Sequence, residues 1–137
     1  MFNFFKKKKD QKEKKSEAKE TTLSEEQLAE IDQKIDEKKE EIVKNENTEE
    51  TDKLAKLYEE LGLLYARKND DEAIPTLEKS LELKLSMGDG YKKLMSLYNE
   101  KRKEAARNGD DAGIDKYMNK MDEMRSVAKK LTISGDK

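Results

Sequence analysis

The chain has 137 residues, a length typical of one domain, and is 45% charged and only 33% apolar. So small an apolar share excludes a thick β-sandwich or a doubly wound sheet, whereas helices that each bury one apolar stripe need less. Cysteine and histidine are both absent, which excludes disulfides, the usual zinc sites and the commonest general base.

Residues 1–22 form a lysine-rich N-terminal arm. Residues 1–19 hold eight lysines against three acidic residues, a formal charge of +5, which leaves −7 for residues 20–137. An arm of this composition buries too little apolar surface to offset its ordering entropy, so we expect residues 1–22 to be disordered.

The first nine residues combine aromatic rings and lysines in a way that suits an anionic membrane surface. The residues expected at that surface are Phe2, Phe4, Phe5, Lys6, Lys7, Lys8 and Lys9. The alternative is a solvated tail without membrane contact. Phenylalanine at position 2 excludes N-myristoylation, and no stretch approaches the roughly 20 apolar residues of a membrane span.

A helical domain is predicted over residues 23–131, followed by a frayed C-terminus over residues 132–137. Ser24 and Gln27 have the spacing of a capping box, which starts a first helix that continues to about Lys44. Its apolar stripe consists of Leu28, Ile31, Ile35 and Ile42. With Lys38 or Lys39 where another apolar residue would be expected, the stripe is thin, so we expect this helix to dock loosely.

Four further helices follow, separated by short polar turns. The second ends near Lys68, and the third begins after a cap at residues 69–71 and continues to about Leu85. The fourth ends at Asn108-Gly109, and the fifth runs from residues 110–111 to Leu131. Short connections make consecutive helices antiparallel neighbours.

The sequence repeats itself with two offsets. At an offset of 33 residues, the second helix aligns with the fourth: Tyr58, Leu61, Leu64 and Tyr65 match Tyr91, Leu94, Leu97 and Tyr98. From residue 66 onward the offset is 40, so that Asp70-Asp71 matches Asp110-Asp111. The extra seven residues are close to two helical turns, so the fourth helix is longer while its apolar face keeps nearly the same direction.

These positions resemble the tetratricopeptide repeat family. The first helix of the family's repeat has a bulky aromatic residue, then Leu-Gly, then Tyr, which match Tyr58, Leu61-Gly62 and Tyr65. The second helix has Ala, then an apolar residue, then a small residue, which match Ala73, Leu77 and Ser80. The resemblance covers residues 55–83 well and residues 88–124 loosely, because the second copy lacks the Leu-Gly pair. It implies an all-α, antiparallel helix-turn-helix stack of about five helices that binds other proteins. A plain helical bundle with coincidental spacing is the alternative.

In that family the first helix of each repeat lines a concave groove that receives a peptide or a helix. The matching positions here are Lys56, Glu59, Leu63, Ala66, Lys92, Ser96 and Asn99. Leu63 lies off the main apolar stripe and has no obvious intramolecular partner, which indicates a contact for a ligand. The alternative is that the first helix or a second copy of the chain covers it.

The sequence therefore predicts a non-enzymatic adaptor or scaffold in the cytoplasm, with residues 1–9 placing it on the inner membrane face. The expected partner is another protein or peptide, without cofactor or metal, and the acidic body argues against nucleic acid. The pairs Asp70-Asp71 and Asp110-Asp111 are explained by helix capping and not by catalysis. The alternative function is a homo-oligomeric structural protein without a groove, in which the first helix pairs with its copy.

Overall fold

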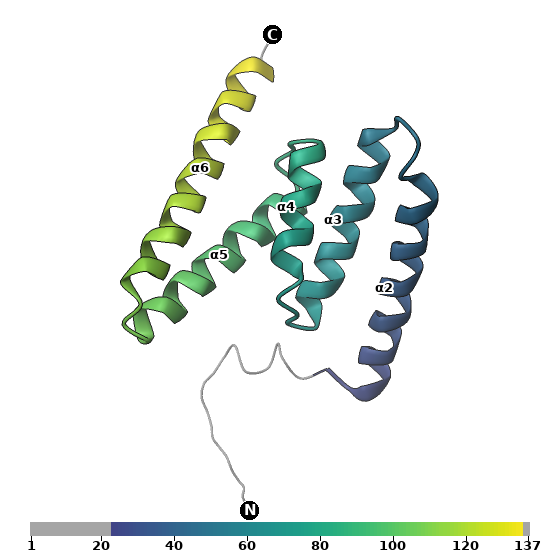
Figure 1. Ribbon diagram of the computed structural model, residues 1–137, viewed down its shortest axis with the longest axis horizontal. Coiled ribbons are helices and arrows are strands. Elements are labelled where there is room, and N and C mark those ends of the chain that lie inside the picture. The colour runs from purple at the N-terminus through teal and green to yellow at the C-terminus, as the bar shows by residue number, and fades with distance from the viewer. Residues whose placement is uncertain (1–22, 136–137) are drawn as a thin grey trace, which may run out of the picture.

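The computed structural model describes residues 23–135, with side chains as far as Lys130. This part of the chain consists of five helices and no strands (Figure 1). They are α2 (Glu25–Asn45), α3 (Thr51–Arg67), α4 (Ala73–Leu83), α5 (Asp89–Arg107) and α6 (Asp111–Gly135). The predicted all-α class and the number of helices are confirmed.

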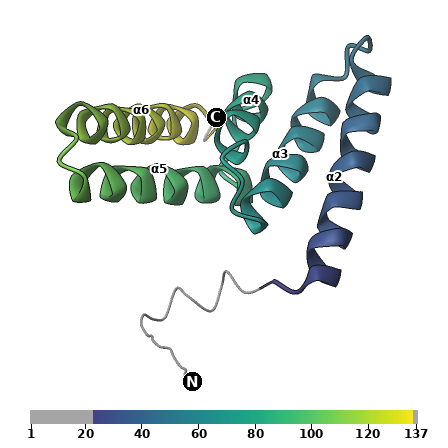
Figure 2. The same ribbon diagram turned by 60° about the horizontal axis from the view of Figure 1, so that its bottom comes forward.

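Consecutive helices pack against each other as an antiparallel stack, and α3 also contacts α5 (Figure 1). Helices α2, α3 and α4 lie side by side, whereas the α5–α6 pair runs at a steep angle to α2 and α3 (Figure 2). The predicted helix-turn-helix stack is thus confirmed. The disordered arm predicted for residues 1–22 lies outside the described residues.

Two apolar clusters hold the stack together. The first joins α2, α3 and the start of α4 through Ile31, Ile35, Ile42, Leu54, Leu57, Leu61, Tyr65 and Ala73. The second joins α4, α5 and α6 through Leu77, Leu94, Tyr98 and Met121. Leu97 packs against both clusters and lies where they meet.

Helix α2 docks firmly, contrary to the loose docking expected from its thin stripe. Ile31, Ile35 and Ile42 are no more than 5% exposed. The position where an apolar residue seemed missing is taken by Lys38, whose Nζ lies 2.6 Å from Glu60 Oε1 on α3. The aliphatic stem of a lysine can cover apolar surface while its charge meets a partner, so the stripe is not interrupted.

Helix ends follow the predicted signals at most positions. Ser24 and Gln27 form the predicted capping box, with Ser24 Oγ accepting from Gln27 N at 3.1 Å. Pro75 lies in the first turn of α4, where a missing backbone N–H costs no intrahelical bond. At the C-terminus α6 continues to Gly135, beyond the end expected at Leu131, because no helix breaker occurs before that glycine.

The two turns that close the helix pairs lie 40 residues apart and have the same geometry. Asn69 and Gly109 both adopt left-handed backbone, with φ of 58° and 68°. The amide of Asp70 donates to Tyr65 O at 3.0 Å, and that of Asp110 donates to Ala105 O at 2.8 Å. These bonds satisfy carbonyls at the ends of α3 and α5.

Candidate protein-binding groove

The residues predicted to line a groove on α3 and α5 do not share one surface. Lys56, Lys92 and Ser96 are exposed, whereas Glu59, Leu63 and Asn99 are partly buried. Lys56 and Glu59 line a small cleft of about 440 Å³ between α3, α4 and the α4–α5 turn. Ser96 lines a different and larger hollow.

Glu59 has an internal partner across the stack. Its Oε2 accepts a hydrogen bond from the amide of Gly90 at 2.8 Å, so a carboxylate of α3 caps the start of α5. Negative charge is favourable at a helix N-terminus, where backbone N–H groups lack partners. A Cβ on Gly90 would lie 2.8 Å from Glu59 Cγ, which explains a residue without a side chain at this position.

Leu63 also has intramolecular partners, which corrects the expectation that it has none. It packs against the second cluster, in which Leu77 is 0% exposed and Leu94 is 1% exposed. Neither the first helix nor a second copy of the chain is needed to cover it. Asn99 Oδ1 accepts from Arg102 Nε at 3.1 Å and from Arg102 Nη2 at 3.0 Å, within α5 itself.

The larger hollow, which we call the α5 groove, has a volume of about 600 Å³. It lies between the end of the α3–α4 hairpin and the middle of α5, at the end of the stack where α2 begins (Figure 1). Its apolar lining consists of Leu23, Ala66, Ala73, Ile74 and Leu97. Its polar lining consists of Arg67, Asn69, Asp70, Asp71, Lys93, Ser96, Glu100, Lys101 and Glu104.

One wall of the α5 groove includes residues of a seven-residue insertion in the second repeat, although α5 is only two residues longer than α3, with 19 residues against 17. The offset changes between Tyr98 and residue 106, so the extra residues are 99–105, and Glu100, Lys101 and Glu104 among them line the groove. Lys101 Nζ lies 3.2 Å from Asp71 Oδ1 and 3.7 Å from Glu104 Oε1. The hydrogen bond to Asp71 raises the pKa of Lys101, opposed in part by its desolvation.

Sequence reasoning missed this groove although its signal was present. The carried-over family positions place the site on the exposed faces of α3 and α5, and of these only Ala66 and Ser96 line the hollow. The change of offset from 33 to 40 residues marks the insertion whose residues Glu100, Lys101 and Glu104 line the groove.

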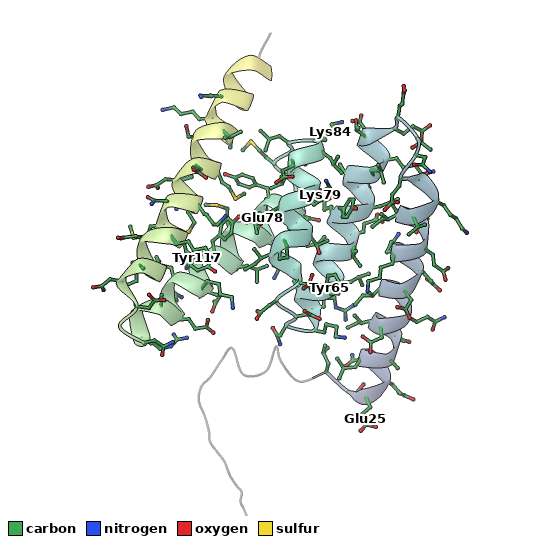
Figure 3. The ribbon with its side chains drawn as sticks, in the orientation of Figure 1. Glu25, Tyr65, Glu78, Lys79, Lys84 and Tyr117 are labelled. Carbon is green, nitrogen blue, oxygen red and sulfur yellow. The ribbon has the colours of Figure 1, made fainter. Side chains whose placement is uncertain are left out.

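A polar network on the other side of α5 fixes the angle of the α5–α6 pair. Tyr98 donates its hydroxyl hydrogen to Glu78 on α4, and Lys120 Nζ on α6 lies 3.3 Å from the same carboxylate oxygen. Figure 3 shows Glu78 on the side of α4 that faces α6. Burial of Tyr98, and then its bond to Glu78, raise the pKa of the phenol well above its usual value. The ring of Tyr117 lies 6.1 Å from that of Tyr98.

Other kinds of site receive little support from the described residues. Across residues 23–130, no three carboxylates are grouped so as to hold a metal ion. No helix of the described chain is long and apolar enough to cross a membrane. The membrane contacts predicted for Phe2, Phe4, Phe5 and Lys6 to Lys9 lie outside the described residues. The chain has no significant match among protein-family models, curated proteins or solved structures.

Proposed function

We propose that the protein is a non-enzymatic interaction module that binds a short segment of another protein in the α5 groove. The observation that carries the proposal is the groove itself: an open hollow with an apolar floor and charged rims. Apolar side chains of a bound segment would cover Ile74 and Leu97, and the rim charges would orient it. Such an adaptor needs neither cofactor nor metal.

The resemblance to tetratricopeptide repeats supports the same proposal. In those repeats a small residue on the first helix allows close packing of the second, and a Cβ on Gly62 would lie 2.6 Å from Leu77 Cγ. Ser80, the small residue of the pattern, donates from Oγ to Ala55 O at 2.7 Å in a buried contact. The order of contacts, α3 with α4, α4 with α5 and α3 with α5, is that of stacked helix pairs.

The dimensions favour a short ligand of modest affinity. Helix α5 has 19 residues and is therefore about 28 Å long, and the groove runs along only part of it. Few side chains of a partner could be enclosed, so the contact area falls below that of a standard stable interface of about 1,600 Å².

Burial argues against the alternative of a homo-oligomeric structural protein. The apolar stripe of α2, which would have to pair with its copy, is buried against α3. On α6, Met118 and Val127 are 46% and 44% exposed but lie nine positions apart, which places them about 180° apart around the helix. They therefore form no continuous stripe, and we expect a monomer in light scattering at high concentration.

We propose a second contact for the N-terminal arm. In this proposal the arm binds the inner, cytoplasmic face of an anionic membrane. Each lysine near such a surface contributes about 1 kcal/mol, and the phenylalanines add apolar insertion. Deleting residues 1–9 is expected to abolish co-sedimentation with vesicles that contain phosphatidylserine. Unchanged co-sedimentation would remove this part of the proposal.

Selection of peptides on the full chain tests the groove. We expect displayed peptides selected on the wild-type protein to lose at least tenfold in affinity when Ser96→Arg fills the groove. Asn119→Arg, the same new side chain at an exposed position of α6 that does not line the groove, is the matched control. Equal effects of both substitutions, or no selected peptide, would contradict the proposal. Leu63→Glu is unsuitable because it would disturb the second cluster.

A further inference from the structure

The path of the chain brings its own N-terminal arm to the α5 groove. Leu23, the first described residue, lines the groove and packs against the first cluster. The point where residues 1–22 join the described chain therefore lies at the edge of the hollow. The other end of the described chain, that of α6, lies at the opposite end of the molecule from the start of α2 (Figure 1).

The composition of the arm complements the lining of the groove. Phe2, Phe4 and Phe5 offer three apolar rings for a floor of leucine, isoleucine and alanine. Eight lysines lie within residues 1–19. On the rim of the groove, four carboxylates (Asp70, Asp71, Glu100 and Glu104) outnumber three cations (Arg67, Lys93 and Lys101) by one. The opposite formal charges of arm and body, +5 and −7, act in the same direction.

The length of the arm allows it to bind in cis. A chain of 22 residues spans at most about 70 Å, more than twice the length of α5. A segment joined to its site by so short a connection acts at an effective concentration of about 1 mM. A contact too weak to form between separate molecules is then occupied within one molecule.

We infer that residues 1–15 of this chain occupy the α5 groove in cis and compete there with the partner segment. This inference rests on the proposed function, because it assigns the first ligand of the same groove. A partner must displace the arm, so its apparent affinity is lowered by the fraction of time that the arm is bound. Whatever holds the arm elsewhere opens the groove.

Paramagnetic labelling of the full chain tests this inference. The chain has no cysteine, so Asn3→Cys provides a single site for a nitroxide beside the phenylalanines. We expect the label to broaden the amide signals of residues 66–74 and 93–104 more than those of α2 and of the second half of α6. Broadening spread evenly over the molecule, or strongest on another face, would overturn the inference.

Two variants of the labelled chain distinguish binding of the arm in the groove from broadening that arises only because the arm is joined to Leu23. Phe2→Ser, Phe4→Ser and Phe5→Ser together leave the length and charge of the arm unchanged, and should reduce broadening at residues 93–104 by more than half. Ser96→Arg should do the same, while Asn119→Arg should not. Equal broadening in the triple variant and in the parent would overturn the inference, because proximity alone would then explain the signal.

The outcome is distinguishable from failure of the proposed function. With the arm disabled by the three serine substitutions, peptides selected on the groove should bind the full chain at least threefold more tightly. In one outcome, Ser96→Arg weakens peptide binding, but the serine substitutions do not raise peptide affinity and the label does not broaden the groove signals. The groove then binds proteins, and only the cis inference fails. If no peptide binds but the label reports the arm in the groove, the arm is the ligand and the adaptor proposal fails.

Discussion

Gly62 shows how one residue sets the spacing of the central helices. It lies inside α3, where glycine is normally unfavourable by about 1 kcal/mol relative to alanine. A Cβ at this position would lie 2.6 Å from both Cγ and Cδ2 of Leu77 and 3.3 Å from Leu77 N. Because Leu77 is fully buried, it has no space into which it could retreat. The close approach of α3 and α4 therefore depends on the absence of a side chain at Gly62.

Gly62→Ala is expected to lower the free energy of unfolding despite the gain in helix propensity. Overpacking in a tight core costs about 1–3 kcal/mol, which exceeds the propensity gain of about 1 kcal/mol. Urea unfolding should thus show a net loss of up to about 2 kcal/mol. In a Leu77→Ala background, where the clashing atoms are gone, the same substitution should cost nothing. An equal loss in both backgrounds would contradict the steric explanation.

The Tyr98 hydroxyl couples stability to alkaline pH. Burial and the Glu78 bond keep the phenol protonated in the folded chain, whereas in the unfolded chain it ionises near its ordinary pKa of 10.0. Folding thus loses stability as the pH rises above 10, by up to about 1.4 kcal/mol per pH unit. Tyr98→Phe should reduce stability at pH 7 by about 1–2 kcal/mol, because a hydrogen bond to a charged group is lost.

The comparison of wild type with Tyr98→Phe can also be made as a function of pH. The stability difference between wild type and Tyr98→Phe should shrink as the pH is raised from 10 to 11, measured by urea unfolding at each pH. Tyr117→Phe keeps the ring that lies 6.1 Å from Tyr98 and should change stability at pH 7 by less than about 0.5 kcal/mol. A difference for Tyr98→Phe that does not vary with pH would show that its phenol is not held protonated by the fold.

Residue roles were predictable from the sequence where they follow from helical spacing alone. The resemblance to the repeat family singled out Gly62 and Ala73, and both are buried, Ala73 to 1% exposure. The roles of Glu59 and Glu78 were not predicted, since Gly90 and Lys120 lie 31 and 42 positions further along the chain. A charged residue on a helix is usually solvated, so only the packing of distant helices identifies these carboxylates as partners.

At the scale of elements, the turns carried the strongest sequence signal. Asn69 and Gly109 occupy the same left-handed position in two turns that are 40 residues apart. A Cβ on Gly109 would meet nothing within 4 Å, so a substitution there tests backbone conformation without steric crowding. At Gly62, by contrast, an added Cβ would clash with Leu77.

Gly109→Ala should lower the free energy of unfolding by about 1–2 kcal/mol, the cost of left-handed backbone for a residue with a Cβ. Gly109→Asn should cost less, because asparagine adopts this conformation more readily and already does so at Asn69. Thermal unfolding monitored by circular dichroism ranks the variants. Equal losses for alanine and asparagine would mean that the turn, and not the residue's conformation, decides the cost.

The docking of helix α2 could not be predicted from its apolar stripe alone. Its three isoleucines predicted the correct face, but the strength of docking was underestimated. Charged residues also join α2 to α3: Lys38 pairs with Glu60, and Lys68 Nζ lies 2.5 Å from Asp32 Oδ1. Such pairs each contribute only about 0–1 kcal/mol, but they fix the register of a helix whose stripe is already buried.

At the scale of the whole molecule, the class and order of the helices followed from the sequence, while the α5 groove did not. Helical periodicity and short turns suffice to predict an antiparallel stack. The groove depends on the insertion in the second repeat and on the angle of the α5–α6 pair. That angle is set by contacts of Leu77 and Glu78 with α5 and α6, which no local pattern reveals.

The division of the interior into two clusters predicts how the molecule opens. In stacked helix pairs each unit contacts only its neighbours, so damage at one end need not reach the other. Ile42→Ala, near the C-terminal end of α2, should weaken mainly the docking of α2 on α3. Leu77→Ala, at the centre of the second cluster, should cost about 2–5 kcal/mol and release the α5–α6 pair.

Native-state hydrogen exchange measures both effects in the full chain. In Ile42→Ala, amides of α2 should lose protection while those of α5 keep it, whereas in Leu77→Ala the amides of α5 and α6 should exchange first. Because the α5 groove lies between α5 and the α3–α4 hairpin, only Leu77→Ala should also weaken peptides selected on the groove. Uniform loss of protection in both variants would show that Leu97, which packs against both clusters, couples them into a single cooperative unit.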